Sequence, residues 1–191
     1  MAKYQQKIIQ PNFSAAFGRE VPSKLRWSVR SDSNRLHDLI YFRSYLHDAR
    51  ISPTQIALHR KILSLRVNRD CWELPMKETK RYRELSIADA LVTLSDVSGY
   101  LWEFDEEHRV LAHQGKDLWI TGIFWDEALQ DAEGTCCLVF SGGRKTWKLK
   151  VFLDEFATIK LRDLEIPYLW SEKNKEKSKI TARSGRVKAR R

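Results

Sequence analysis

Two identical His-Asp pairs are the first residues in this chain that could support catalysis or metal binding. Leu36-His37-Asp38 recurs further along as Leu46-His47-Asp48. An imidazole beside a carboxylate can form a general base or a metal site. On an α-helix, however, the second pair would be turned roughly 80° from the first and moved about 15 Å along the axis. We therefore expect capping and surface hydrogen bonds from both pairs, and no metal site.

The densest group of carboxylates lies in the stretch 103–108, which ends at His108. Crowded carboxylates on a loop can bind a divalent cation or act as acid and base. The Asp, Asn and Gly spacing of a calcium-binding loop is missing from this stretch. We expect a solvated turn between two strands. The alternative is a hydrolase or nuclease that uses these acids with His108 or His113.

A glycine pair inside Ser141-Gly142-Gly143-Arg144-Lys145 suggests a phosphate-binding loop only superficially. Such a loop must lead into a helix whose N-terminus faces the phosphate. The residues after Lys145 alternate in polarity as a strand does, so we exclude nucleotide binding here. The motifs of dinucleotide-binding folds, zinc proteases and serine hydrolases are also missing. The sequence therefore favours a protein without a catalytic site.

The chain has three cysteines, Cys71, Cys136 and Cys137, and no C-x-x-C motif. An odd number does not fit a closed set of disulfides. Adjacent residues of a strand point to opposite faces, so Cys136 and Cys137 are not expected to bridge each other. We expect three reduced thiols, no zinc or other cofactor, and a soluble cytoplasmic protein. No apolar run approaches the length of a membrane span, and the N-terminus lacks a signal-like core.

The net charge of +9 is concentrated at the two ends of the chain. Residues 1–35 hold seven Lys and Arg against two acids, and residues 171–191 hold nine against two. The body between them, 36–170, has 18 basic and 21 acidic residues. The body is therefore mildly acidic and both ends are basic.

The C-terminal segment gives the strongest functional signal. It has no aromatic residue and a high charge density, so it cannot bury enough apolar surface to fold alone. Spaced basic side chains attract phosphates through counterion release. The candidate nucleic-acid-binding residues are Lys173, Lys175, Lys177, Lys179, Arg183, Arg186, Lys188, Arg190 and Arg191. The alternatives are contact with a partner protein or a membrane surface, or a solubilising role with no dedicated partner.

Seven tryptophans are many for a chain of this length, and most should lie in the core. Residues 118–125, LWITGIFW, are apolar on both faces and predict a central strand, with Gly122 as a bulge or a close backbone approach. Trp119 and Trp125 share one side of that strand. That side is a candidate protein interface.

Residues 135–151, TCCLVFSGGRKTWKLKV, predict a β-hairpin with Gly142-Gly143 as a two-residue loop. In that register Leu138 lies opposite Trp147, Cys136 opposite Leu149, and Gly134 opposite Val151. One face is apolar and the other carries Lys148 and Lys150, as expected when one side covers a core.

The next segment continues this alternation. Ala157, Ile159 and Leu161 alternate with polar residues and predict a further strand after a turn at Asp154-Glu155. Together, residues 118–161 predict a four-stranded meander. The face with Lys148, Lys150 and Lys160 would then extend the basic track of the tail, an idea that its acidic surroundings weaken.

The remaining chain predicts shorter elements. Residues 25–29 predict a first strand, and 55–67 a hairpin that turns at His59-Arg60-Lys61. A short helix is expected near 34–48 and is ended at the latest by Pro53. Residues 85–97 predict a strand or bent pair, and Ser98-Gly99 a turn into a strand over 100–104.

These elements predict one α+β domain built mainly of antiparallel sheet, as a meander, a sandwich or a curved half-barrel. An irregular arm occupies 1–24, the globular domain 25–170 and the flexible tail 171–191. The expected function is a non-enzymatic binding or adaptor module with a basic tail for nucleic acid. The alternatives are an inhibitor-like protein-interaction domain and the hydrolase or nuclease described above.

Overall fold

The computed structural model describes residues 24–30, 35–74, 76–78, 83–126, 136–143, 146–154, 157–169 and 171. The predicted N-terminal arm and basic tail therefore lie almost entirely outside the described residues, as does Trp170. Neither described helix has the length and apolar composition needed to cross a lipid bilayer.

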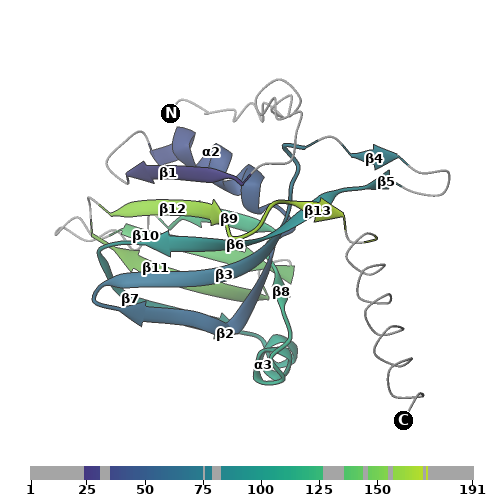
Figure 1. The fold of residues 1–191 in the computed structure, drawn as a ribbon. Helices are drawn as coiled ribbons and strands as arrows, with labels where there is room; N and C mark the ends of the chain where they lie inside the picture. The colour runs from purple at the N-terminus through teal and green to yellow at the C-terminus, as the bar shows by residue number, and fades with distance from the viewer. Residues whose placement is uncertain are drawn as a thin grey trace, which may run out of the picture.

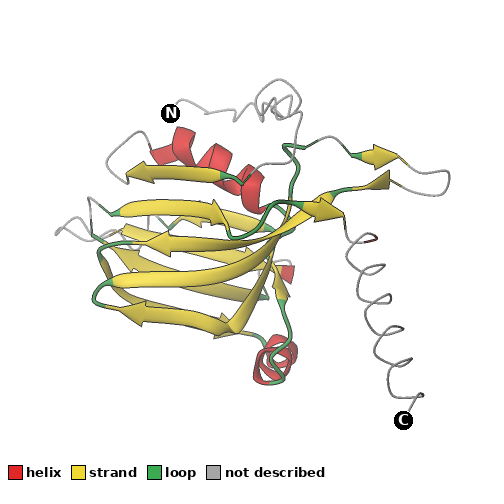
Figure 2. Cartoon of the chain, viewed as in Figure 1, coloured by secondary structure: helices red, strands yellow, loops and turns green. Residues whose placement is uncertain are grey.

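Antiparallel strands dominate the described residues and form two main sheets (Figures 1 and 2). The strands of the larger sheet are β1 (Arg26–Arg30), β2 (Arg50–His59), β3 (Ile62–Asp70), β6 (Ser86–Leu94), β8 (Leu118–Trp119), β12 (Thr158–Asp163) and β13 (Tyr168–Leu169). Those of the smaller sheet are β7 (Val97–Phe104), β9 (Gly122–Trp125), β10 (Cys136–Gly142) and β11 (Trp147–Leu153). A separate pair consists of β4 (Lys77–Glu78) and β5 (Arg83–Glu84).

Within the described ranges the larger sheet is seven-stranded, in the order β1-β12-β6-β3-β2-β8, with β13 paired to β6. The smaller sheet is four-stranded, in the order β7-β11-β10-β9. Among the described residues, two short helices accompany the sheets, α2 (Arg35–Leu46) and α3 (Glu106–His113). The predicted α+β fold with mainly antiparallel sheet is confirmed.

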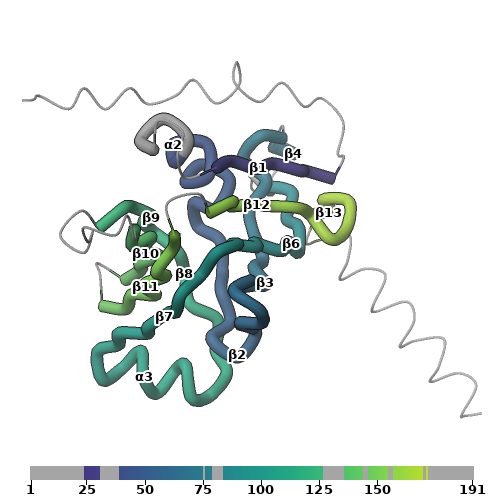
Figure 3. Tube along the Cα trace, turned by 90° about the vertical axis from the view of Figure 1, so that its left-hand side faces the viewer, coloured from purple at the N-terminus to yellow at the C-terminus, as the bar shows by residue number. Residues whose placement is uncertain are grey.

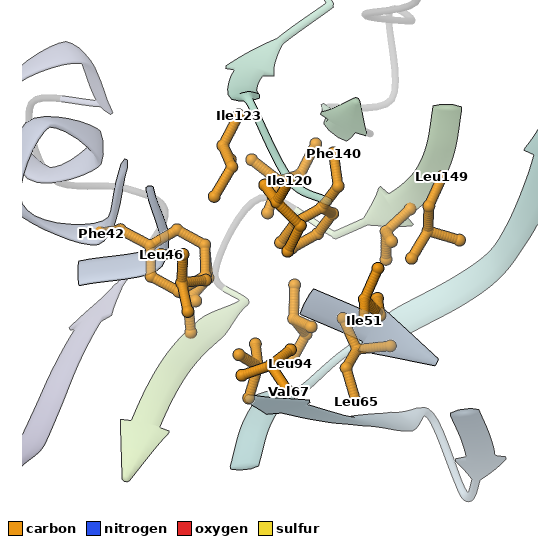
Figure 4. Close-up of a cluster of buried hydrophobic side chains, with 14 of the residues drawn as sticks. Phe42, Leu46, Ile51, Leu65, Val67, Leu94, Ile120, Ile123, Phe140 and Leu149 are labelled. Carbon is orange, nitrogen blue, oxygen red and sulfur yellow. The ribbon is translucent and has the colours of Figure 1, made fainter. Parts of the chain in front are cut away.

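One hydrophobic core joins the two sheets as a sandwich. Leu65 and Leu94 enter it from the seven-stranded sheet, and Phe140 and Leu149 from the four-stranded sheet (Figure 4). All four side chains are fully buried. Burial at this level stabilises the fold by about 1.5–3 kcal/mol for each large apolar side chain.

Helix α2 closes one side of the sandwich, and its position confirms the predicted helix near 34–48. Phe42, which is fully buried, stacks on Trp27 of β1 with ring centroids 5.3 Å apart. It also packs in a T-shaped arrangement with Phe140 of β10, with ring centroids 6.0 Å apart. The helix therefore lies on the same side of the seven-stranded sheet as the four-stranded sheet (Figure 3).

Helix α3 occupies the stretch predicted as a solvated acidic turn, so that prediction is wrong. Asp105 is its N-cap and accepts a hydrogen bond from the backbone N–H of His108 at 2.8 Å. Glu106 and Glu107 follow in the first turn, where negative charge is favoured by the helix dipole. The capping residue followed by two acids was the signal for this helix in the sequence.

The β10-β11 hairpin exists, but its predicted register is wrong. Leu138 lies opposite Val151, and Gly142 lies opposite Trp147 inside the ladder. Gly142 is needed for close approach, because a Cβ there would overlap the carbonyl oxygen of Trp119. The turn therefore begins at Gly143, which has φ +54°. The register differs by an even number of residues, so the predicted faces of both strands are correct.

The predicted four-stranded meander over 118–161 is also wrong, because the chain changes sheets twice. Residues 118–125 form two short strands, β8 in the larger sheet and β9 at the edge of the smaller one. Between them, the N–H of Ile120 donates to Ala49 and that of Thr121 to Ser141. After β11 the chain returns to the larger sheet, where β12 pairs with β1 and β6.

The β2-β3 hairpin turns where the sequence predicts. Arg60 and Lys61 have φ of +47° and +61°, and Leu63, Leu65 and Val67 point together into the core. Pro53 does not end a helix. It lies inside β2, where the pairing with β3 is irregular between Ile51 and Ile56, as is usual for proline in an edge segment.

The turn between β6 and β7 lies earlier than predicted. Ser95-Asp96 connects the two strands, and Asp96 has φ +54°. Ser98 and Gly99, the predicted turn, belong to β7 itself. The strand predicted over 100–104 therefore begins at Val97.

Candidate nucleic-acid interface

The outer face of the seven-stranded sheet, opposite the core, carries a set of basic side chains. In β12 the buried Ile159 and Leu161 alternate with the exposed Lys160 and Arg162. This alternation follows from the pleat of the strand, which sends successive side chains to opposite faces. We name the set the basic face; it comprises Arg26, Arg30, Arg50, Arg66, Lys160 and Arg162.

Two arginines of the basic face lie directly opposite each other in neighbouring strands. Arg26 of β1 pairs with Arg162 of β12, and both are exposed. Neither they nor Lys160 form an ion pair with another described residue. Like charges in directly opposite positions destabilise a sheet. The arrangement therefore costs stability unless an anion lies between or above the two guanidinium groups.

The same row of residues continues across two more strands. Arg162 lies opposite Leu91 of β6, and Leu91 lies opposite Arg66 of β3. The side chain of Arg66 is 52% exposed and reaches the carboxylate of Asp89 at 3.3 Å. The basic face thus extends from the edge strand β1 to the middle of the sheet.

A second row ends in a polar cleft. Trp119 of β8, Arg50 of β2, Asn68 of β3 and Asp89 of β6 occupy successive opposite positions. Asn68 accepts from Arg50 Nη2 at 2.5 Å and donates to Asp89 at 3.0 Å. The cleft has a volume of about 270 Å³ and is lined by Arg50, Ser52, Gln55, Arg66, Val67, Asn68, Asp89 and Asp117.

Arg50 brings to this cleft a buried polar atom without a hydrogen-bond partner in the described part of the chain. Its guanidinium carbon lies 5.1 Å from the ring centroid of Trp119, a cation–π contact. Its Nε is buried and has no hydrogen-bond partner among the described residues. A buried donor without an acceptor costs about 1–3 kcal/mol. Trp119 itself remains 51% exposed beside the cleft.

The acids of 103–108 do not converge on one site. Glu103 points to the outer face of the four-stranded sheet, where it meets Lys150 at 2.6 Å and Lys148 at 3.7 Å. The hydrogen bond from Lys150 lowers the pKa of Glu103 below its usual value. Asp105 caps α3, and its pKa is lowered by the backbone N–H of His108. Lys148 and Lys150 are thus partly neutralised, and Lys160 lies on the other sheet rather than beside them.

His108 connects α3 to the β10-β11 turn. Its Nδ1 lies 2.8 Å from the carboxylate of Asp105, and its Nε2 lies 3.4 Å from the hydroxyl of Thr146. The ring packs against Gly143, where a Cβ would come within 3.1 Å of Nε2. A carboxylate, imidazole and hydroxyl in this order can act as base and nucleophile. They can equally fix the end of the helix to the turn.

The remaining predicted site residues are placed as follows. Trp119 and Trp125 do not share a strand: Trp119 is exposed in β8, whereas Trp125 of β9 packs against the core. His47 is bonded to its neighbour Asp48 at 2.9 Å. The nine basic residues of the tail lie outside the described residues. All three cysteines are buried and none forms a disulfide with another described residue, and burial raises the pKa of Cys137 to about 11.

The basic face was missed as a unit in the sequence, although a signal was present. RWSVR in β1 and IKLR within β12 each place basic residues an even number of positions apart, which puts those residues on one side of a strand. What the pattern did not show is that the two strands are neighbours. Among the described residues no group of three or more His, Cys, Asp or Glu side chains could hold a metal ion.

No protein-family model, curated protein or solved structure matches this chain.

Proposed function

We propose that this protein is a non-enzymatic binding module for single-stranded nucleic acid, which it contacts through the basic face and the basic tail. The observation that carries the proposal is the Arg26–Arg162 pair. These exposed like charges lie directly opposite each other and have no counter-ion among the described residues. A phosphate backbone is a ligand that turns this unfavourable arrangement into a favourable one.

The spacing of the basic face supports a polymeric anion. Basic side chains two residues apart on a strand are separated by about 6.6 Å, and those on neighbouring strands by about 4.8 Å. Such spacing allows several phosphates of one chain to be contacted together. Trp119, at the end of the second row, offers an exposed aromatic surface for an unpaired base. This combination favours a single strand over a duplex, whose bases are already stacked.

The experiment is fluorescence-anisotropy binding to single-stranded DNA and RNA across a salt series. The double variant Arg26→Gln with Arg162→Gln should weaken binding. It should also reduce the log–log salt slope by about 0.7 for each phosphate that the protein no longer neutralises. The matched control is Arg43→Gln with Arg109→Gln, which removes two exposed charges on the helices α2 and α3, away from the basic face. Equal effects of both doubles would show that only net charge matters and would contradict the proposed surface.

A chain that ends at residue 170 separates the tail from the sheet. If both contribute, truncation should lower the affinity and the salt slope, while the remaining binding stays sensitive to Arg162→Gln. Complete loss of binding on truncation would assign the interaction to the tail alone. No binding by the full chain at low salt would exclude nucleic acid and favour the protein-interaction alternative.

One specific observation supports the hydrolase alternative: the side chains of Asp105, His108 and Thr146 are hydrogen-bonded in series. It predicts that the protein hydrolyses an activated ester and that Thr146→Val abolishes this turnover, whereas Thr146→Ser retains it. Absence of turnover with unchanged folding would leave the three residues as a connection between α3 and the turn.

A further inference from the structure

The polar cleft at the end of the basic face has features that phosphate binding does not require. It contains carboxylates as well as guanidinium groups, and carboxylates repel phosphates. Asp89 is already bonded to Arg66 and Asn68. Asp117, in contrast, is exposed on the rim and forms no ion pair with the described residues. A ligand of the cleft must therefore satisfy an arginine and a carboxylate together.

We propose that the cleft is a base-reading subsite that takes one guanine of the bound strand. Arg50 would donate to the acceptor edge of the base and Asp117 would accept from its donor edge. The inference rests on the proposed function, because the base is part of a nucleic acid held by the basic face. It adds sequence preference to a surface that otherwise reads only phosphate charge.

The donors on the protein side come from Arg50. Of the five N–H donors of a guanidinium, one in Arg50 meets a described acceptor, Oδ1 of Asn68. Nε is buried without a partner, so the present arrangement is incomplete in hydrogen bonding. A base with two adjacent acceptors would allow the guanidinium to form a bidentate contact.

The chemistry of the bases selects guanine. Its O6 and N7 are adjacent acceptors, the pattern that arginine binds most often. Its N1–H and N2–H are adjacent donors, which match the two oxygens of a carboxylate. Adenine presents an amino donor where guanine has O6. Cytosine and uracil do not have both a pair of adjacent acceptors and a pair of adjacent donors.

Size and stacking fit the same ligand. A volume of about 270 Å³ lies just below the range of roughly 300–1,000 Å³ typical of sites for whole drug-sized molecules. A single base is therefore more suitable than a larger molecule. The guanidinium of Arg50 lies over Trp119, with its carbon 5.1 Å from the ring centroid, so a base bonded to the edge of this guanidinium would lie beside an aromatic ring on which bases stack.

The test compares the full chain bound to short oligouridines with one central guanine or one central adenine, at fixed salt. We expect the guanine oligomer to bind on the order of tenfold tighter, the discrimination of a good bidentate contact. Arg50→Lys keeps the charge but removes the planar fork, so it should abolish this preference. Arg162→Gln, the control, should weaken both oligomers equally.

Base analogues test the two edges without changing the protein. 7-Deazaguanine lacks the N7 acceptor and should lose part of the preference in the wild-type chain. Inosine lacks the N2 amino group, so the wild-type chain should bind it more weakly than guanine. In Asp117→Ala, which lacks the acceptor for that amino group, inosine and guanine should bind equally. These measurements keep the proposal testable even if Arg50→Lys does not fold.

The outcomes separate the two proposals. Equal binding of both oligomers, or an Arg50→Lys effect that is equal for guanine and adenine, would overturn the base-reading subsite and leave the basic face as a surface that reads only phosphate charge. Failure of the wild-type chain to bind either oligomer would overturn the proposed function, and the subsite with it.

Discussion

At the residue scale, the charged side chains on the outer faces of the two sheets fall into two classes: those with an ion-pair partner and those without one. On the four-stranded sheet, Lys150 Nζ lies 2.6 Å from Oε1 of Glu103, and this hydrogen bond raises the pKa of Lys150 above its usual value. Arg26 and Arg162 on the other sheet face each other without a counter-ion among the described residues. Charges without partners are the ones expected to meet a ligand.

The Glu103–Lys150 pair has a defined pH dependence. A carboxyl whose pKa is lowered in the folded protein stabilises it above the unfolded pKa. That contribution is lost as pH falls through the lower folded pKa. The pair is thus formed at neutral pH and leaves Lys150 with little capacity for another anion.

The Arg26–Arg162 pair gives a prediction that separates stability from function. Arg162→Glu replaces a repulsion by an attraction to Arg26. It should raise the free energy of unfolding by roughly 0.2–1 kcal/mol, measured by urea denaturation. The same variant should bind single-stranded nucleic acid more weakly than wild type.

Arg162→Gln serves as the intermediate, because it removes the repulsion without adding an attraction. A fall in stability for both variants would mean that Arg162 is held by a structural contact. In that case the pair would give no support to the binding surface.

At the element scale, the β2-β3 turn contains local strain. Arg60 and Lys61 adopt positive φ of +47° and +61°, a region that disfavours residues other than glycine and asparagine. The backbone is nevertheless well anchored, since the carbonyl of Lys61 accepts from Val97 at 2.9 Å. Two basic residues thus occupy the tip of a hairpin where Asn-Gly would be the favoured pair.

Replacing Arg60-Lys61 by Asn-Gly should therefore stabilise the protein. We expect an increase of about 1 kcal/mol in the free energy of unfolding, because the strain of two positive-φ residues is relieved. Asp154→Asn is the control, as it removes the exposed Lys61–Asp154 pair at 3.4 Å without changing the turn. A decrease in the double variant larger than that of the control would show that the tip depends on its side chains.

At the scale of the whole molecule, a buried ion network joins distant parts of the chain. Arg69 of β3 is fully buried and donates to Asp163 of β12 at 2.8 Å and to Glu73 at 2.6 Å. Asp163 also accepts from the N–H of Leu25, just before β1, at 2.8 Å. Burial would lower the pKa of Arg69, but the hydrogen bonds to Asp163 and Glu73 raise it above its ordinary value.

Breaking this network should be costly. Arg69→Met leaves two buried carboxylates without their cation and is expected to lower the free energy of unfolding by about 3–5 kcal/mol. The free energies of unfolding of Arg69→Met and Arg66→Met are compared by urea denaturation. Arg66 is the control because it is an exposed arginine on the same strand. A loss of less than about 1 kcal/mol in Arg69→Met would mean that the network contributes little.

Much of the local structure was predictable from the sequence. The alternation of polar and apolar residues located β1, β3, β10, β11 and β12 and showed which side of β3, β11 and β12 is buried. The turn at Arg60-Lys61 and helix α2 were also predicted. These features depend on neighbours within a few residues, which is the range over which the period of a strand or helix acts.

Only the tertiary structure decided which strands are neighbours. The alternating pattern of β12 fits either sheet equally, and its pairing with β1 depends on contacts between residues that are far apart in the chain. The β10-β11 register likewise depends on Gly142 fitting under the Trp119 carbonyl, which belongs to another element. The sequence by itself therefore determined the charge of the basic tail and the faces of the strands. The basic face and its cleft exist only because the fold brings β1, β12, β3 and β2 into one sheet.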